Sequence, residues 1–98
     1  MEVYLGLGSN LGDKCLHLRT AINEIEKRIG HVECQSAFVE TEPWGFESDN
    51  TFVNAVVRVD TALSPLDLLK ETQTIEREMG RTHKTVDGKY SDRLIDID

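Results

Sequence analysis

The sequence predicts an α+β domain in which two helices pack on one face of an antiparallel sheet. Three observations lead to this prediction: segments in which apolar residues alternate, segments with helical periodicity, and the order in which these segments follow one another. The 98 residues are enough for one domain with a buried core. We therefore expect a single domain over residues 1–98.

The first half of the chain predicts a strand and then a helix. Residues 3–8 alternate so that three apolar side chains share one face: Val3, Leu5 and Leu7. Residues 13–29 predict a helix, because apolar residues recur at steps of three and four: Cys15, Leu18, Ile22, Ile25 and Ile29. Gly30 follows directly and is predicted to be a left-handed C-terminal cap.

Two β-rich runs, 32–41 and 52–61, then predict an antiparallel pair joined by a long polar connection. A second helix is predicted to begin after Ser64, which suits an N-cap and precedes Pro65, and to end at Gly80. Residues 81–92 predict a loop, and residues 93–98 a last strand. The order βαββαβ predicts a ferredoxin-like sheet with both helices on one face.

Composition excludes several classes of protein. A formal charge of -7 disfavours nucleic-acid binding, which requires basic groups on phosphates. No apolar run approaches the about 20 residues that cross a membrane. Cys15 and Cys34 have no CxxC spacing, so we expect buried structural thiols in a cytoplasmic protein. His17 and His31 lack metal-ligand spacing and are expected at the surface.

Asp96 and Asp98 are the candidate metal ligands. Side chains two apart in a strand point the same way, so Ile95 and Ile97 should face the helices and the two aspartates the open side. Mg²⁺ prefers one or two carboxylates together with substrate phosphates, and pairs of such ions assist phosphoryl transfer. The alternative is an edge strand kept soluble by charge.

Positive charge gathers just before these carboxylates, and such a cluster can bind a triphosphate or be a solvated loop. Its members are Arg77, Arg81, His83, Lys84, Lys89 and Arg93. On the open side of the 52–61 strand, Phe52 and Asn54 should lie near the aspartates. An amide suits a heterocycle with alternating donors and acceptors, although a hydrogen bond to neighbouring backbone explains it equally well. The glycines of residues 6–12 do not have the spacing of a dinucleotide-binding loop.

Five segments together resemble the 6-hydroxymethyl-7,8-dihydropterin pyrophosphokinase family over the whole chain. They are Gly8-Ser9-Asn10-Leu11, Thr41-Glu42-Pro43-Trp44-Gly45, Phe52-Val53-Asn54-Ala55, the set Gln73, Glu76, Gly80 and Arg81, and Asp92-Arg93-Leu94-Ile95-Asp96-Ile97-Asp98. The resemblance implies transfer of a diphosphate from ATP to the pterin hydroxymethyl group in folate biosynthesis, with AMP released. It also implies two Mg²⁺ ions on Asp96 and Asp98.

The resemblance further implies a role for individual residues. Arg81 and Arg93 would stabilise the transferred group. Residues near ATP would be Gln73, Glu76, Arg81, His83, Tyr90 and Arg93. Residues around the pterin would be Thr41, Pro43, Trp44, Gly45, Phe52 and Asn54. Two positions depart from the family: Tyr90 stands in place of a tryptophan and His83 in place of an arginine.

The family continues for roughly another third beyond Asp98, so this chain is expected to be its N-terminal two thirds. We expect a monomer that binds ATP and the pterin, and neither nucleic acid nor membrane. Two alternatives remain open at this point. One is a non-catalytic nucleotide- or pterin-binding module, or an inactive fragment of the enzyme; the other is an unrelated ferredoxin-like interaction or RNA-binding domain.

Overall fold

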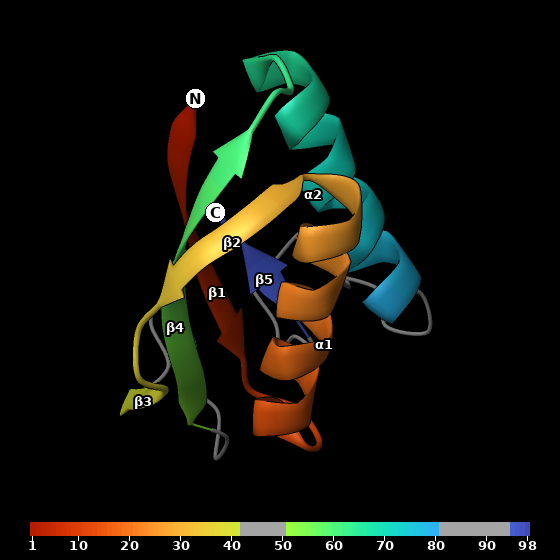
Figure 1. Ribbon diagram of the computed structural model, residues 1–98. Helices are drawn as coiled ribbons and strands as arrows, with labels where there is room; N and C mark the ends of the chain where they lie inside the picture. Colours follow the sequence, from red (N-terminus) through yellow and green to blue (C-terminus); the bar gives the residue numbers. More distant parts are fainter. Residues whose placement is uncertain (42–50, 81–94) are drawn as a thin grey trace.

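The computed structural model describes residues 1–41, 51–80 and 95–98. Its elements are β1 (Glu2–Ser9), α1 (Lys14–Arg28), β2 (Gly30–Gln35), β3 (Val39–Thr41), β4 (Phe52–Thr61), α2 (Pro65–Gly80) and β5 (Asp96–Ile97). The strands form one antiparallel sheet in the order β2-β4-β1-β5, with β3 paired to β4 (Figure 1). The predicted α+β class with an antiparallel sheet and two helices is therefore confirmed.

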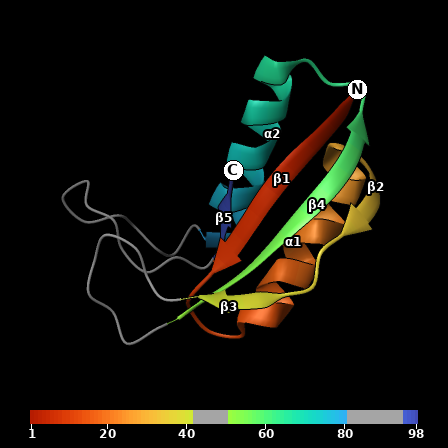
Figure 2. The ribbon, with the colours of Figure 1, turned by 90° about the vertical axis from the view of Figure 1, so that its left-hand side faces the viewer.

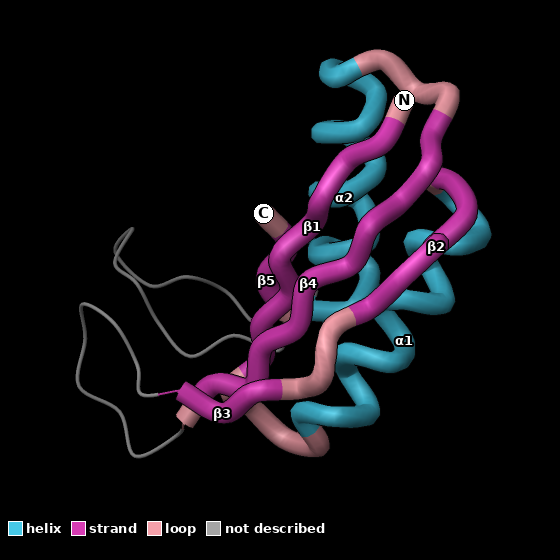
Figure 3. The backbone as a smooth tube through the Cα atoms, turned by 60° about the vertical axis from the view of Figure 1, so that its left-hand side comes forward, coloured by secondary structure: helices cyan, strands magenta, loops and turns pink. Residues whose placement is uncertain are grey.

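Both helices lie against one face of the sheet, and the other face carries no helix among the described residues (Figures 2 and 3). The core between the two layers consists of apolar side chains from both helices, from β1, β4 and β5, and from two residues next to these elements. They are Leu5, Leu7, Leu18, Ala21, Ile25, Ile29, Ala55, Val57, Val59, Ile75, Ile95 and Ile97. The expected helix-facing sides of the first and last strands are thus correct. Neither helix in the described part of the chain has the length and apolar character to cross a membrane.

Both helices begin with a side-chain cap, of which the sequence predicted the one at Ser64. Asp13 caps α1, since its Oδ1 accepts a hydrogen bond from the Leu16 N–H at 3.2 Å. Ser64 caps α2 in the same way, with its Oγ accepting from the Asp67 N–H at 3.2 Å. Each cap satisfies one of the amide groups that the first turn of a helix leaves without a partner.

The predicted left-handed cap at Gly30 is wrong. Ile29 ends α1 in a right-handed conformation, and Gly30 is already the first residue of β2. A Cβ on Gly30 would lie 2.1 Å from the carbonyl oxygen of Asp60 in β4. The glycine is therefore required because two backbones approach closely, and not because the chain needs a positive φ.

The predicted strand 32–41 is divided into β2 and β3. A register shift between Val32 and Cys34 places an extra residue in β2. Further along, Ser36 Oγ accepts from the Val56 N–H at 2.9 Å, so a side chain takes the place of a ladder carbonyl. Pairing with β4 resumes only at Val39.

The burial of three side chains differs from the predictions. Cys34 is exposed, because the bulge sets it opposite Arg58 on the uncovered face, and Cys15 is only half-buried; both thiols are free. His17 is also half-buried, with its Nδ1 3.4 Å from Ser9 Oγ. His31 is exposed as expected. The predicted polar connection over residues 42–50 and the predicted loop over residues 81–92 lie outside the described residues.

Candidate functional site

A pocket of about 280 Å³ opens on the face of the sheet that carries no helix. Its walls come from β1, β4 and the C-terminal segment: Gly6, Leu7, Gly8, Phe52, Asn54, Ala55, Val56, Asp96 and Asp98. The volume is close to the lower end of small-molecule pockets, which begin at about 300 Å³. Residues far apart in the sequence therefore meet at one site.

The two candidate metal ligands both line this pocket. Asp98 exchanges two backbone hydrogen bonds with Gly6, at 2.9 and 2.8 Å, and Asp96 lies opposite Gly8. Ile95 and Ile97 point the other way and are only 5% and 6% exposed. Burial of the isoleucines therefore fixes which face the carboxylates occupy, as the alternation predicted.

Gly6 and Gly8 form the floor of the pocket, which the sequence alone did not indicate. No described atom lies within 4 Å of a Cβ built on Gly6, so the space above it is open. A Cβ on Gly8 would lie 2.9 Å from Asn54 Oδ1 and 3.5 Å from Phe52 Cδ1. Gly6 lies opposite Val56 and Gly8 opposite Asn54, and their spacing of two places both glycines on one face of β1.

Asn54 is held in one orientation. Its Nδ2 donates to Thr41 Oγ1 at 2.6 Å and to the Val39 carbonyl at 3.5 Å, both in β3. Its Oδ1 lies on the side of Gly8, over β1. The bond to neighbouring backbone, which was the alternative to a ligand role, is present, but the stronger contact is to the Thr41 hydroxyl. The amide oxygen is thus oriented along the pocket floor.

The start of β4 is tied to both α1 and β3. Lys14 Nζ donates to the Thr51 carbonyl at 3.0 Å and to its Oγ1 at 3.3 Å. Thr51 Oγ1 in turn donates to Glu40 Oε1 at 2.9 Å. This network holds Thr51, the residue before Phe52, against Glu40 of β3 and Lys14 of α1. The sequence did not predict it.

The predicted residues of α2 differ in their surroundings. Gln73 is exposed and does not line the pocket. Glu76 is half-buried, and its Oε2 accepts a hydrogen bond from the Ile97 N–H at 3.2 Å. The remaining predicted site residues lie outside the described residues: Pro43, Trp44, Gly45, Arg81, His83, Tyr90 and Arg93.

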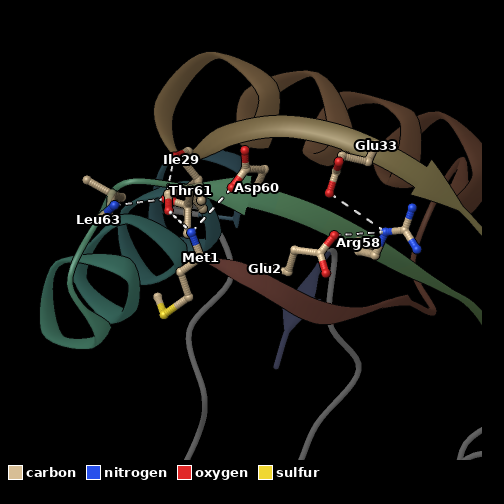
Figure 4. Close-up of polar contacts among 8 residues, drawn as sticks. All are labelled: Met1, Glu2, Ile29, Glu33, Arg58, Asp60, Thr61 and Leu63. Atoms are coloured by element: carbon tan, nitrogen blue, oxygen red, sulfur yellow. Dashed lines mark hydrogen bonds and ion pairs between the residues drawn. The ribbon is translucent and has the colours of Figure 1, made fainter.

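At the far end of the same face, Arg58 forms a separate charged cluster (Figure 4). Its Nε lies 3.7 Å from both Glu2 Oε2 and Glu33 Oε1. A hydrogen bond with Tyr4 and the two carboxylates raise the pKa of Arg58. This guanidinium therefore interacts with Glu2 and Glu33 and does not line the pocket.

The described residues can hold a cation only through a small number of carboxylates. In the ranges 1–41, 51–80 and 95–98, no group of three or more His, Cys, Asp or Glu side chains is arranged to bind a metal. Such a poor ligand set is unsuited to structural zinc but suits Mg²⁺, which takes one or two carboxylates and completes its shell with phosphate and water. The pocket places the Asp96 and Asp98 carboxylates on one face with the Asn54 amide and the Phe52 ring.

Comparison with known proteins identifies the family. Residues 4–98 match the model of 7,8-dihydro-6-hydroxymethylpterin-pyrophosphokinase (HPPK), and the chain belongs to this family. Three relatives named 2-amino-4-hydroxy-6-hydroxymethyldihydropteridine pyrophosphokinase align with nearly the whole chain. The protein of Porphyromonas gingivalis is 54% identical over 98% of this chain and 65% of its own length.

The other two relatives are more distant. The Aquifex aeolicus protein is 40% identical over 98% of this chain and 58% of its own length. The Bacillus subtilis protein is 38% identical over 97% and 56%. The chain therefore spans less than two thirds of the length of these curated relatives.

Proposed function

We propose that this chain provides the substrate site of an enzyme that transfers diphosphate from ATP to 6-hydroxymethyl-7,8-dihydropterin and releases AMP, in folate biosynthesis. The observation that carries the proposal is the shared pocket: the carboxylates of Asp96 and Asp98 lie on the same face as the Asn54 amide and the Phe52 ring. Phosphate-binding and heterocycle-binding groups are thus adjacent, as transfer between two substrates requires.

Asp96 and Asp98 would hold two Mg²⁺ ions. The carboxylate pair fits these ions, because both side chains reach the pocket and substrate phosphates would supply the remaining ligands. When bound, the ions neutralise phosphate charge and align the reacting groups. The contribution of the protein is to keep both carboxylates on one face, which the burial of Ile95 and Ile97 enforces.

Asn54 and Phe52 would bind the pterin. The amide of Asn54 is already oriented by Thr41, so its oxygen can accept from a ring N–H without a loss of side-chain freedom on binding. The Phe52 ring lies next to Gly8, which leaves room for a flat ligand on the floor. Thr41, Pro43, Trp44 and Gly45 would complete the pterin site from the 41–45 segment.

The nucleotide would be bound by residues of α2 and the segment that follows. We assign to it Gln73, Arg81, His83, Tyr90 and Arg93. The sequence also suggested Glu76, but its Oε2 accepts the Ile97 N–H and so has a different role. Arg81 and Arg93 would act as catalytic residues by stabilising charge on the transferred diphosphate, since preorganised cations contribute most where charge develops. Support for these roles comes from the family match over residues 4–98.

We further propose a ferredoxin-like, single-domain fold for residues 1–98, with the C-terminal part of the family fold lying beyond this chain. The order β2-β4-β1-β5 supports it, because one helix lies between β1 and β2, the other lies between β4 and β5, and all strand pairs are antiparallel. We also propose that the protein is a monomer. The exposed free thiol of Cys34 supports a reducing, cytoplasmic setting.

The test is a turnover assay on the longest polypeptide that the gene encodes. With ATP, Mg²⁺ and 6-hydroxymethyl-7,8-dihydropterin, we expect AMP and the pterin diphosphate in equal amounts. The matched control is Asp96→Asn, which keeps the size of the side chain and should form neither product. Pterin and nucleotide binding without AMP from the unsubstituted protein would contradict the proposal and favour a non-catalytic binding module.

A further inference from the structure

The peptide between the two pocket aspartates has one N–H that the sheet does not use. Asp98 exchanges both of its backbone hydrogen bonds with Gly6, so the neighbouring residue Ile97 must direct its N–H away from β1. Among the described strands, β5 is the last on this side of the sheet. The Ile97 N–H therefore faces the outer edge.

Glu76 occupies that edge. Its Oε2 accepts the Ile97 N–H at 3.2 Å, and the side chain is half-buried where α2 lies against β5. Its neighbour Ile75 is 1% exposed, so packing of α2 on the core sets where the carboxylate can reach. A charge-assisted hydrogen bond to a backbone amide is stronger than a neutral one, and partial burial strengthens it further.

We propose that Glu76 is a positioning residue that holds β5 in place and thereby sets the relative aim of Asp96 and Asp98. The inference rests on the proposed function, because positioning matters for the metal only if the two aspartates bind it. The segment that carries the pair is then held from both edges: Asp98 exchanges hydrogen bonds with Gly6 of β1, and Ile97 donates one to Glu76 of α2. A strand of only two residues gains its order from these few bonds.

This role differs from the nucleotide contact that the sequence suggested for Glu76. A direct contact to a cation or a nucleotide depends on the charge or on both carboxylate oxygens. Positioning through the Ile97 N–H depends on a single acceptor oxygen, which glutamine also has. Glu76→Gln and Glu76→Ala therefore separate the two roles.

The experiment is done by NMR on the chain in Mg²⁺-free buffer and then during titration with Mg²⁺. The first measurement is the hydrogen-exchange rate of the Ile97 amide. We expect Glu76→Ala to raise it about tenfold or more and Glu76→Gln to leave it within about threefold of the unsubstituted chain. Glu78→Gln is the matched control, because Glu78 is on the same helix but its Oε2 pairs with Arg28.

The second measurement is the Mg²⁺ dissociation constant from the amide shifts of Asp96 and Asp98. We expect a weakening of about tenfold in Glu76→Ala, little change in Glu76→Gln and Glu78→Gln, and an unchanged unfolding midpoint in all three. The effect of Glu76→Ala should disappear in an Asp96→Asn background, because there is then no pair to position.

Two results would overturn the inference. An Ile97 exchange rate that does not respond to Glu76→Ala would show that the bond does not hold β5. A Gln variant as impaired as the Ala variant in Mg²⁺ affinity would show that the charge of Glu76 acts directly. If the unsubstituted chain shows no Mg²⁺ response, the proposed function fails at its metal site, and the exchange rates still decide whether Glu76 holds β5.

Discussion

Asn54 and Thr41 are joined across two strands by a hydrogen bond of 2.6 Å from Nδ2 to Oγ1. This bond determines which end of the amide faces the pocket, because the nitrogen is used by β3 and the oxygen lies over Gly8. A ligand at this site therefore meets an acceptor whose direction is set by the fold.

Because of this bond, we expect Asn54→Ala and Thr41→Val to weaken pterin binding to different extents. Asn54→Ala should weaken binding of 6-hydroxymethyl-7,8-dihydropterin by about tenfold or more, because a ring donor loses its partner in a desolvated site. Thr41→Val should weaken it less, since the amide remains but is free to rotate. Fluorescence titration of the pterin measures both variants, and equal affinities in all three proteins would exclude Asn54 from the site.

A substitution at the floor glycine Gly6 should not reduce stability but should weaken pterin binding. Gly6→Ala should leave the free energy of unfolding unchanged or raise it by about 0.5–1 kcal/mol, because the space above it is open and alanine suits a strand better. The added methyl occupies the pocket, so pterin affinity should fall. Urea unfolding and the same titration test this, and unaltered affinity would place the ligand elsewhere.

Gly8→Ala should act through its neighbour. Its Cβ would be 2.9 Å from Asn54 Oδ1, so the amide must turn away and its bond to Thr41 is strained. We expect a loss of pterin affinity at least as large as that of Asn54→Ala, with little effect in an Asn54→Ala background. Additive effects of the two substitutions would contradict the direct contact.

We predict that Gly30→Ala lowers the free energy of unfolding and has no direct effect on the pocket. The Cβ would lie 2.1 Å from the Asp60 carbonyl oxygen, and backbone on both sides must move. We expect a cost of about 1–3 kcal/mol or more in urea unfolding, typical of overpacking. Stability equal to that of the parent would mean that β2 and β4 separate easily at this end.

Removal of the buried Thr61 hydroxyl should also lower the free energy of unfolding. Its Oγ1 donates to the Ile29 carbonyl at 2.7 Å and accepts the Leu63 N–H at 3.1 Å, which joins the end of α1 to the turn before α2 (Figure 4). Thr61→Val should cost about 1–3 kcal/mol, because both partners lose their hydrogen bond. Thr61→Ser keeps the hydroxyl and should cost clearly less.

Most of the fold was predictable because period and capping are local properties. The alternation of Val3, Leu5 and Leu7 and the N-caps at Asp13 and Ser64 depend only on neighbouring residues. Gly30 was misinterpreted because a glycine after a helix is usually a cap. Only the approach of the Asp60 carbonyl, which is 30 residues away in sequence, explains it.

The site was predictable in part for the same reason. Alternation placed Asp96, Asp98, Phe52 and Asn54 on one face, and the pocket contains all four. The floor of Gly6 and Gly8 depends on the register between β1 and β4, which a single sequence does not give. The bond from Ile97 to Glu76 likewise depends on how α2 packs beside β5.

The most direct test of the account is a Mg²⁺ titration of the chain with a non-hydrolysable ATP analogue present, followed through the backbone amides of Asp96 and Asp98. We predict saturable shifts at these two amides and at Gly6 and Gly8, and the loss of these shifts in both Asp96→Asn and Asp98→Asn with the fold retained. Saturable shifts that persist in both variants, or that occur only at residues away from the pocket, would contradict the assignment of the two aspartates as the metal site.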